Sequence, residues 1–385
     1  MKVLFFGHTG IEKRQCIERL ALHCLQKEGL PEDLDNLRAR QFVRVFHLED
    51  GIADLARGDY ISYLDLFNAP TQRQIWSQAW DSMLAEIAVS QATHHFVTLH
   101  ASYFRKNRFF SAANIEALRQ FAPDAVVTLI DDAHECWERI RVREADHKRG
   151  TDLRLRDILL WRTVEVMAGD FIFSAPTRNY VVAAKHPTEM VRRLLFHTHT
   201  RVYASFPITS ARGDPERMAS VDGFRSTLHE KYATFDPLTI DERRLSTALD
   251  AGADAKGFIT IDIATGWPLT YPDGFEQMAP DEGVTYPIRI PIDQVQEATK
   301  DIDHQIEARD YRLIDQVDAV AAFRPNMNGH FSKGVHAELL YASQTTGIPV
   351  HLVWNDAEDG PFGQSPFGAS GVPHEDTTGL CQALD

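Results

Sequence analysis

Residues 309–353 read RDYRLIDQVDAVAAFRPNMNGHFSKGVHAELLYASQTTGIPVHLV, and this stretch decides the fold of the second half of the chain. Within it, residues 317–323 form a short apolar run bounded by polar residues, which predicts a buried parallel strand. The polar, glycine-containing residues 326–333 predict a loop. Residues 335–345 have helical spacing, and the apolar run at 348–353 predicts the next strand. This alternation of strands and helices is typical of a mostly parallel α/β sheet.

Two acidic residues of this stretch lie where such sheets bind ligands. In an open α/β sheet, ligands bind at the carboxyl ends of the strands, where loops meet helix N-termini. Glu338 falls in the first turn of the predicted helix, and Asp310 lies on the helix that precedes the first strand. We therefore expect the two carboxylates to lie close together.

The order of residues here resembles the nucleoside 2-deoxyribosyltransferases and their nucleotide N-glycosidase relatives. The shared pattern is D-x7-D, then S-x-G-x-x-x-E-L-x-Y-A, then G-x-P-V. It is matched by Asp310, Asp318, Ser332, Gly334, Glu338, Tyr341, Ala342, Gly347, Pro349 and Val350. Residues 201–208, RVYASFPI, resemble the first strand and loop of the same domain. The resemblance covers about the last half of the chain, interrupted by an unfamiliar segment at about 214–300.

The resemblance implies a chemistry for the two carboxylates. Cleavage of an N-glycosidic bond passes through a transition state with positive charge at the anomeric carbon, which two acidic groups suit. In the families concerned, the residue matching Glu338 is the nucleophile and the residue matching Asp310 handles the departing base. The alternative for Glu338 is a glutamate placed near a helix N-terminus by the helix dipole.

The resemblance also implies substrate-binding residues. Serine at position 332 is typical of the branch that hydrolyses nucleoside 5′-monophosphates, although Ser332 is also well placed to cap a helix. A helix N-terminus attracts phosphate, so both roles are compatible. Asp318 either contacts substrate or only orients backbone. The candidate substrate-binding residues are Tyr203, Ser332, Gly334, Arg212 and Asp318.

In the first half of the chain, a strand predicted at 2–6 and a helix predicted at 11–28 enclose a glycine turn. The turn resembles the phosphate-binding loop GxxxxGK[ST] and consists of Gly7, His8, Thr9, Gly10, Ile11, Glu12, Lys13 and Arg14. The first glycine and the lysine are in register, but Glu12 replaces the second glycine and Arg14 replaces the hydroxyl residue that would hold magnesium. A nucleotide-binding relic or a purely structural turn is therefore favoured over a working kinase. The candidate nucleotide-binding residues are Gly7, Gly10 and Lys13.

The rest of the first half supports a fold of the same class. Its alternating strands and helices resemble an adenylate-kinase-like nucleoside monophosphate kinase in degenerate form. The arginines between 139 and 156 alternate with acidic residues, which favours a salt-bridged helix surface over a phosphate clamp. A chain of 385 residues is also too long for one ordinary domain.

We therefore expect two α/β domains, each with a mostly parallel sheet flanked by helices. Residues 1–198 are expected to form the kinase-like domain. Residues 199–385 are expected to form a flavodoxin- or Rossmann-like, deoxyribosyltransferase-like domain, with an insertion at about 214–300.

Composition limits the partners. The chain has 40 basic and 55 acidic residues, and its net charge of −15 argues against a general nucleic-acid binder, which carries a basic face. No apolar stretch approaches the ~20 residues needed to cross a bilayer, and MKVLFFG is too short for a signal peptide. Four cysteines without a CxxC pair indicate reduced thiols. We expect a cytoplasmic protein with no membrane partner, no cofactor and no metal, whose ligand is a small nucleotide.

The segment 355–371 is rich in Gly, Pro and Asp, and its aromatic residues are Phe362 and Phe367. Relatives of the second domain often complete their pockets with a neighbouring chain. We therefore expect at least a dimer, with this segment lying on the partner; a mobile tail is the alternative.

Together these features favour cleavage of the base–sugar bond of a nucleotide, with water as the favoured acceptor and another base as the alternative. The first domain is then expected to sense or present a nucleotide. Such a pairing suits nucleotide depletion in bacterial phage defence, with NAD as a second possible target. Two other functions stay open, namely a nucleotide-sensing protein without turnover and an active kinase in the first half.

Overall fold

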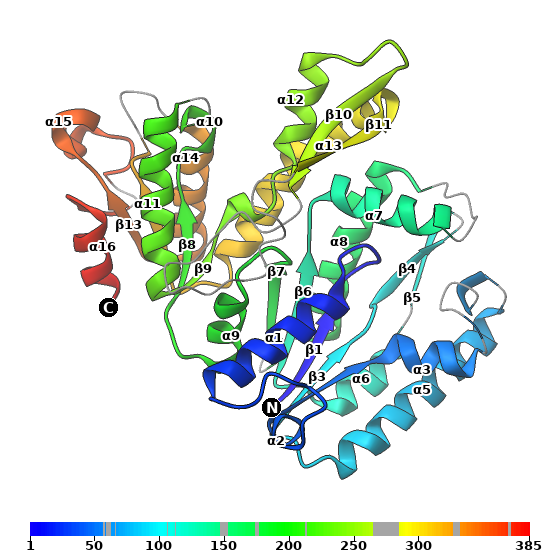
Figure 1. Ribbon diagram of the computed structural model, residues 1–385. Helices are drawn as coiled ribbons and strands as arrows, with labels where there is room; N and C mark the ends of the chain where they lie inside the picture. Colours follow the sequence, from blue (N-terminus) through cyan, green and yellow to red (C-terminus); the bar gives the residue numbers. More distant parts are fainter. Residues whose placement is uncertain are drawn as a thin grey trace. The chain divides into compact units, whose positions relative to one another are not determined.

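The chain folds into two compact α/β units (Figure 1). The computed structural model describes residues 1–56, 58, 63–65, 67–105, 107–111, 113–146, 153–173, 177–211, 214–264, 285–325, 332–368 and 371–385. The first unit comprises Met1–Ala184, Glu242–Ile261 and Pro287–Lys300. The second comprises Lys185–Asp241, Asp262–Tyr286 and Asp301–Asp385. Both units are therefore discontinuous in sequence.

The first unit is built on a five-stranded parallel sheet with the strand order β2-β3-β1-β6-β7. These strands are β1 (Lys2–Phe6), β2 (Val43–His47), β3 (His94–Thr98), β6 (Ala125–Ile130) and β7 (Arg178–Ala183). All six residues of β6 are buried, as expected for a strand covered on both faces. Ser102–Arg105 and Arg108–Ser111 form an antiparallel hairpin, β4 and β5.

The helices of the first unit follow the strands along the chain. They are α1 (Lys13–Lys27), α2 (Leu37–Phe42), α3 (Leu48–Leu55), α5 (Ala69–Val89), α6 (Ile115–Phe121), α7 (Ala133–Asp146), α8 (Leu155–Ile172) and α12 (Arg243–Ala251). Helix α5 begins where the Asn68 side chain accepts a hydrogen bond from Thr71 N. It buries Trp76 and Trp80, whose rings stack with centroids 5.3 Å apart. Burial of such large apolar surfaces is the main stabilising contribution to this core.

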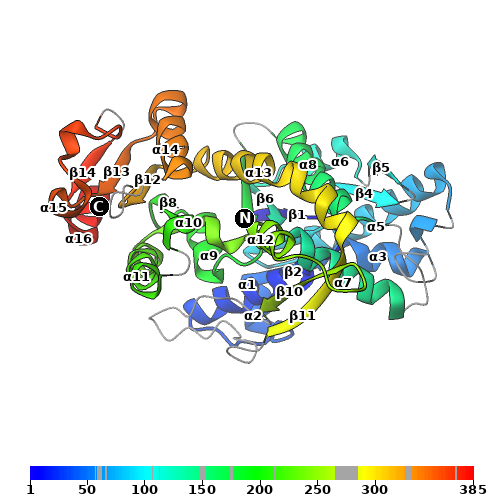
Figure 2. The ribbon, with the colours of Figure 1, turned by 90° about the horizontal axis from the view of Figure 1, so that it is seen from above.

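Three further elements continue this part of the chain. Strands β10 (Phe258–Ala264) and β11 (Thr285–Pro291) pair with each other. Helix α13 (Ile292–Ile314; Figure 2) follows them in the chain; its residues up to Lys300 belong to the first unit and those from Asp301 belong to the second. It carries Asp310 in its last turns.

The second unit contains another five-stranded parallel sheet, with the order β14-β13-β12-β8-β9. Its strands are β8 (Arg201–Ser205), β9 (Ala233–Phe235), β12 (Ala319–Phe323), β13 (Val350–Val353) and β14 (Val372–His374). Numbered along the chain, this is the flavodoxin-like order 2-1-3-4-5, in which the order reverses between the first and third strands. The topological switch point therefore lies between β8 and β12.

The helices of the second unit are α9 (Thr188–Phe196), α10 (Ile208–Ala211), α11 (Pro215–Lys231), α14 (Lys333–Leu340), α15 (Asp356–Asp359) and α16 (Thr377–Leu384). Short 3₁₀ turns occur at Pro237–Thr239 and Phe362–Gln364. A π-helical turn, Tyr341–Thr346, continues α14. The predicted helix at 335–345 is thus present, and the described structure starts it two residues earlier.

The predicted fold class is confirmed, because each unit has a parallel sheet flanked by helices. Strand predictions at 317–323 and 348–353 correspond to β12 and β13. Strands β9 and β14 were not predicted, because three residues are too few to show a periodicity. Nowhere in the described part of the chain is there a helix both long enough and apolar enough to cross a membrane.

The C-terminal segment packs on its own unit. Phe367 is fully buried, and its ring lies against those of Trp354 and His336, at 5.8 and 5.4 Å between centroids. Phe367 therefore packs against residues of its own chain. The segment stays on its own unit because β14, which follows it, pairs with β13 of the same sheet, and α16 comes directly after β14. The homo-oligomer itself stays a prediction.

Phe367→Ala is expected to destabilise the second unit by about 3 kcal/mol, because it leaves a cavity beneath Trp354. Phe362→Ala is the matched control, since Phe362 also contacts Trp354 but is partly exposed. Phe362→Ala is expected to lower the free energy of unfolding by about 1 kcal/mol. Denaturant unfolding of both variants measures the difference, and equal losses would contradict the anchoring role of Phe367.

Candidate active site

Strand β8 places two polar side chains at the switch point of the second sheet. Side chains alternate along a strand, so Tyr203 and Ser205 share one face while Val202 and Ala204 enter the opposite core cluster. Ser205 ends the strand and pairs with Ala322 of β12. Both polar residues are fully buried. Their face of the sheet therefore carries polar groups where ligands of this fold class bind.

Helix α14 delivers Glu338 to the same place. The helix begins at Lys333, after Ser332, whose hydroxyl accepts a hydrogen bond from Val335 N at 3.4 Å. Glu338 is the sixth residue of the helix, so the expectation of a first-turn position is wrong by about one turn. The Ser205 hydroxyl donates a hydrogen bond to Oε2 of Glu338. Glu338, which the sequence predicts to be the nucleophile, is thus hydrogen-bonded by Ser205 of β8.

Helix α13 contributes the second carboxylate. Asp310 is 7% exposed, and Arg309 donates hydrogen bonds to its Oδ1 from Nε at 3.0 Å and from Nη2 at 2.9 Å. The remaining arm of Arg309 donates to the Ile240 carbonyl at 3.1 Å. A guanidinium fixed in this way both orients Asp310 and balances its charge.

The carboxyl groups of Glu338 and Asp310 interact strongly. Burial, followed by the negative charge of Asp310, raises the pKa of Glu338 to about 8. Ser205, Tyr203 and Arg309 act in the opposite direction and do not outweigh these causes. The pair therefore keeps a proton at neutral pH, with Glu338 as its holder.

Tyr203 adds a buried hydroxyl to the site. Burial and the charges of Asp310 and Glu338 raise its pKa well above the usual range. Its hydroxyl faces Glu338, and the hydrogen bond between them lowers the pKa of that carboxyl.

The other predicted substrate-binding residues divide into two groups. Ser332 caps α14, and Gly334 lies in its first turn, where an added Cβ would meet no atom within 4 Å. Asp318 instead begins β12 and accepts hydrogen bonds from Arg201 N and Nε at 2.9 and 3.0 Å. Since these parallel strands start there, Asp318 lies at the opposite edge of the sheet from Glu338. Arg212 lies outside the described residues.

Sequence reasoning missed Ser205 and Arg309. The sequence contained a signal for Ser205, because this residue lies two positions after Tyr203 in a predicted strand and must therefore lie on the same face of the sheet. Arg309 had none, because adjacent helical residues do not normally face each other. The long side chain of Arg309 nevertheless reaches back to Asp310.

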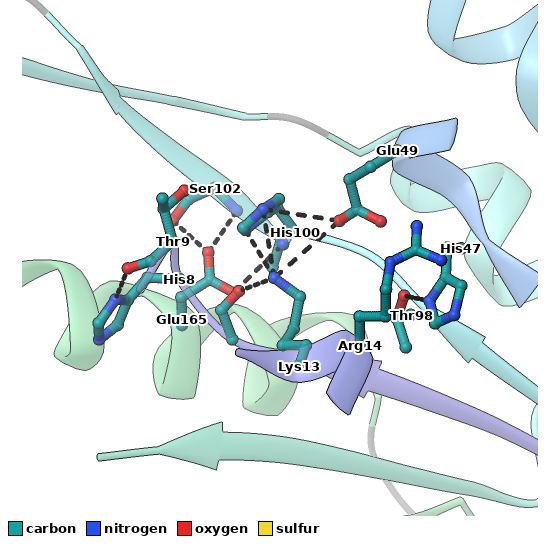
Figure 3. Close-up of polar contacts among 12 residues, drawn as sticks. His8, Thr9, Lys13, Arg14, His47, Glu49, Thr98, His100, Ser102 and Glu165 are labelled. Atoms are coloured by element: carbon teal, nitrogen blue, oxygen red, sulfur yellow. Dashed lines mark hydrogen bonds and ion pairs between the residues drawn. The ribbon is translucent and has the colours of Figure 1, made fainter. Parts of the chain in front are cut away.

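The first unit has a second polar cluster at the carboxyl ends of β1 and β3 (Figure 3). The Lys13 ammonium donates to the Gly7 carbonyl at 2.7 Å and lies 3.1 and 3.2 Å from the two ring nitrogens of His100. A carboxylate oxygen of Glu49 lies 4.0 Å away. Lys13 is 8% exposed, and burial lowers its pKa. The predicted phosphate-binding lysine is thus engaged with groups of its own chain.

A fully buried glutamate closes the other side of this cluster. Glu165 accepts hydrogen bonds from Ser102 N and Oγ, both at 2.7 Å, and from Ala101 N at 3.2 Å. Burial raises the pKa of Glu165 and of Glu49. Two carboxylates beside one ammonium leave little attraction for a phosphate.

The loop before Lys13 is held by packing. Gly10 has φ +94°, and an added Cβ would lie 2.9 Å from the Cys136 carbonyl of α7. Glu12 adopts φ +57°, and its carboxylate pairs with Arg143 at 2.8 Å. Arg139 pairs with Asp131 and Glu135, as expected for a salt-bridged helix surface. These contacts favour the structural-turn alternative for Gly7, Gly10 and Lys13.

No model of a known protein family matches the chain, and no curated protein sequence matches it. Among the residues that the structure describes, no group of three or more His, Cys, Asp or Glu side chains is arranged to hold a metal ion. The functional argument therefore depends on the two sites themselves.

The first unit is expected not to transfer phosphate from ATP to a nucleoside monophosphate. Lys13 is balanced by Glu49 and Glu165, and Arg14, in place of a hydroxyl, pairs with Asp50. Product formation is measured by chromatography beside a kinase of known activity. Steady transfer that disappears in Lys13→Ala would contradict this expectation, whereas binding without transfer would not.

Proposed function

We propose that the second unit cleaves the N-glycosidic bond of a nucleotide, with Glu338 as the nucleophile. One observation carries the proposal: the Glu338 carboxyl, hydrogen-bonded by Ser205 at the end of β8, interacts with the buried carboxyl of Asp310 at the switch point of a parallel sheet. Strongly perturbed carboxyl groups at such a place are typical of catalytic sites. The resemblance at residues 310–350 assigns the same two residues.

The shared proton fits this reaction. A departing base needs a proton, and the attack on the anomeric carbon needs an ionised carboxylate. The proton leaves Glu338 and passes through Asp310 to the base as the C–N bond breaks. Glu338 then forms an ester bond to the sugar, and water attacks this ester while Asp310 accepts a proton from the water. Arg309 keeps Asp310 in position for both steps.

The start of α14 supports a phosphorylated substrate. Backbone N–H groups at a helix N-terminus attract phosphate, and Ser332 and Gly334 border that end of the helix. A nucleoside 5′-monophosphate is therefore the substrate class we favour.

The direct test is to incubate the full chain with nucleotides, nucleosides and NAD and to follow free base by chromatography. Glu338→Gln is expected to reduce base release at least ~10³-fold, because an amide cannot serve as the nucleophile. Its unfolding curve should show an intact fold. Wild-type rates in this variant, or no base release from any substrate by the native chain, would sink the proposal.

Asp310→Asn is expected to slow cleavage most for bases that are poor leaving groups, since these need the proton most. A loss of about 10²-fold is expected for a natural base and a much smaller loss for a nitrophenyl glycoside. Comparing kcat/KM for the two substrates measures the difference. An equal loss for both would show that Asp310 only positions the ligand.

A further inference from the structure

We propose that Ser205 is a positioning residue, whose hydroxyl fixes Oε2 of Glu338 and leaves Oε1 to face the sugar. This inference rests on the proposed function for its catalytic consequence. Its structural part stands on the hydrogen bond from Ser205 to Glu338. Tyr203 also supports the Glu338 carboxylate by a hydrogen bond, and the contribution of Ser205 is the larger of the two.

The strand makes Ser205 a rigid support. Its backbone is held in β8 by pairing with Ala322 of β12, and its side chain is fully buried. Glu338, in contrast, has a long side chain whose freedom must be lost before it can attack a single carbon atom. A donor fixed on a strand holds such a side chain more precisely than one on a loop.

The charges around Glu338 explain why this donor matters. Two effects disfavour the ionised form of the Glu338 carboxyl, namely the burial of this carboxyl and the negative charge of Asp310. The groups that face it from the packed elements are Tyr203 of β8 and Arg309, Asp310 and Tyr311 of α13. Arg309 donates to Asp310 rather than to Glu338, so the ionised form is supported directly by the hydroxyls of Ser205 and Tyr203, with Ser205 contributing more.

Ser205→Ala tests the inference through the pH profile. The midpoint assigned to Glu338 is expected near pH 8 in the native chain and about one unit higher in the variant, because a hydrogen bond to a charged group is lost. With a nitrophenyl glycoside, which needs no proton, kcat/KM should rise through this midpoint. At pH 7, kcat should fall about ten-fold with little change in KM. Ser205→Cys, which keeps a weak donor, should lie between the two.

The matched control is Ser343→Ala, which removes a hydroxyl that donates to the Leu339 carbonyl at 2.7 Å on the same helical segment. It should leave the midpoint unchanged. A merely structural role for Ser205 predicts lower stability with an unmoved midpoint, and that result would overturn the inference.

A measurement without substrate separates this inference from the proposed function. Difference infrared spectroscopy follows the protonated carboxyl signal that Glu338→Gln removes. Its titration midpoint should move upward in Ser205→Ala and stay fixed in Ser343→Ala. If the native chain cleaves no substrate but this shift occurs, the function fails and the positioning role stands. If cleavage occurs and neither midpoint moves, the positioning role fails alone.

Discussion

Two carboxyl groups held side by side away from water cannot both ionise easily, and the second unit is arranged around this constraint. Glu338 and Asp310 come from helices α14 and α13, and their carboxyl groups interact at the switch point of the sheet, where β8 and β12 are neighbours. Arg309 balances one of the two negative charges, and Ser205 supports the other group by a hydrogen bond. The result is a pair that stores a proton near neutral pH, which is the state that acid–base chemistry requires.

The first unit balances its buried ionisable groups by placing a positive charge among them. Its switch region also gathers buried ionisable groups, but here the ammonium of Lys13 is placed among the carboxylates of Glu49 and Glu165. The polar atoms of Glu165 are met by three hydrogen bonds from the turn at Ala101 and Ser102. A buried ion pair stabilises little beyond what its desolvation costs, yet removal of one partner is expensive. This cluster is therefore better suited to fixing the loop than to exchanging its partners for a phosphate.

Much of this arrangement could be predicted from the sequence, and the reasons for the failures are specific. Long apolar runs such as residues 125–130 predicted strands because burial on both faces leaves a strong signal. Glu338 and Asp310 were predicted to meet, because carboxyl ends of parallel strands share an edge. Asp318 is also an acidic residue of the same motif. It precedes β12 instead of following a strand, so it lies at the end of the sheet opposite to Glu338. Short strands such as β14 carried no periodic signal, and the burial of Phe367 depends on contacts with Trp354 and His336 that are distant in sequence.

The difference between the two units lies in what the chain leaves incomplete. Around Lys13, the carbonyl of Gly7, the ring of His100 and two carboxylates already surround the charge. Around Glu338, the hydroxyls of Ser205 and Tyr203 and the charge of Arg309 favour the ionised carboxylate but do not outweigh burial and the charge of Asp310. The electrostatic balance of this carboxyl is thus left incomplete. A positively charged anomeric centre would favour the ionised form of Glu338 and offset the repulsion from Asp310. Under the proposed function, a reacting sugar would therefore complete the electrostatic balance of the second unit, and such complementarity to a transition state is what catalysis requires.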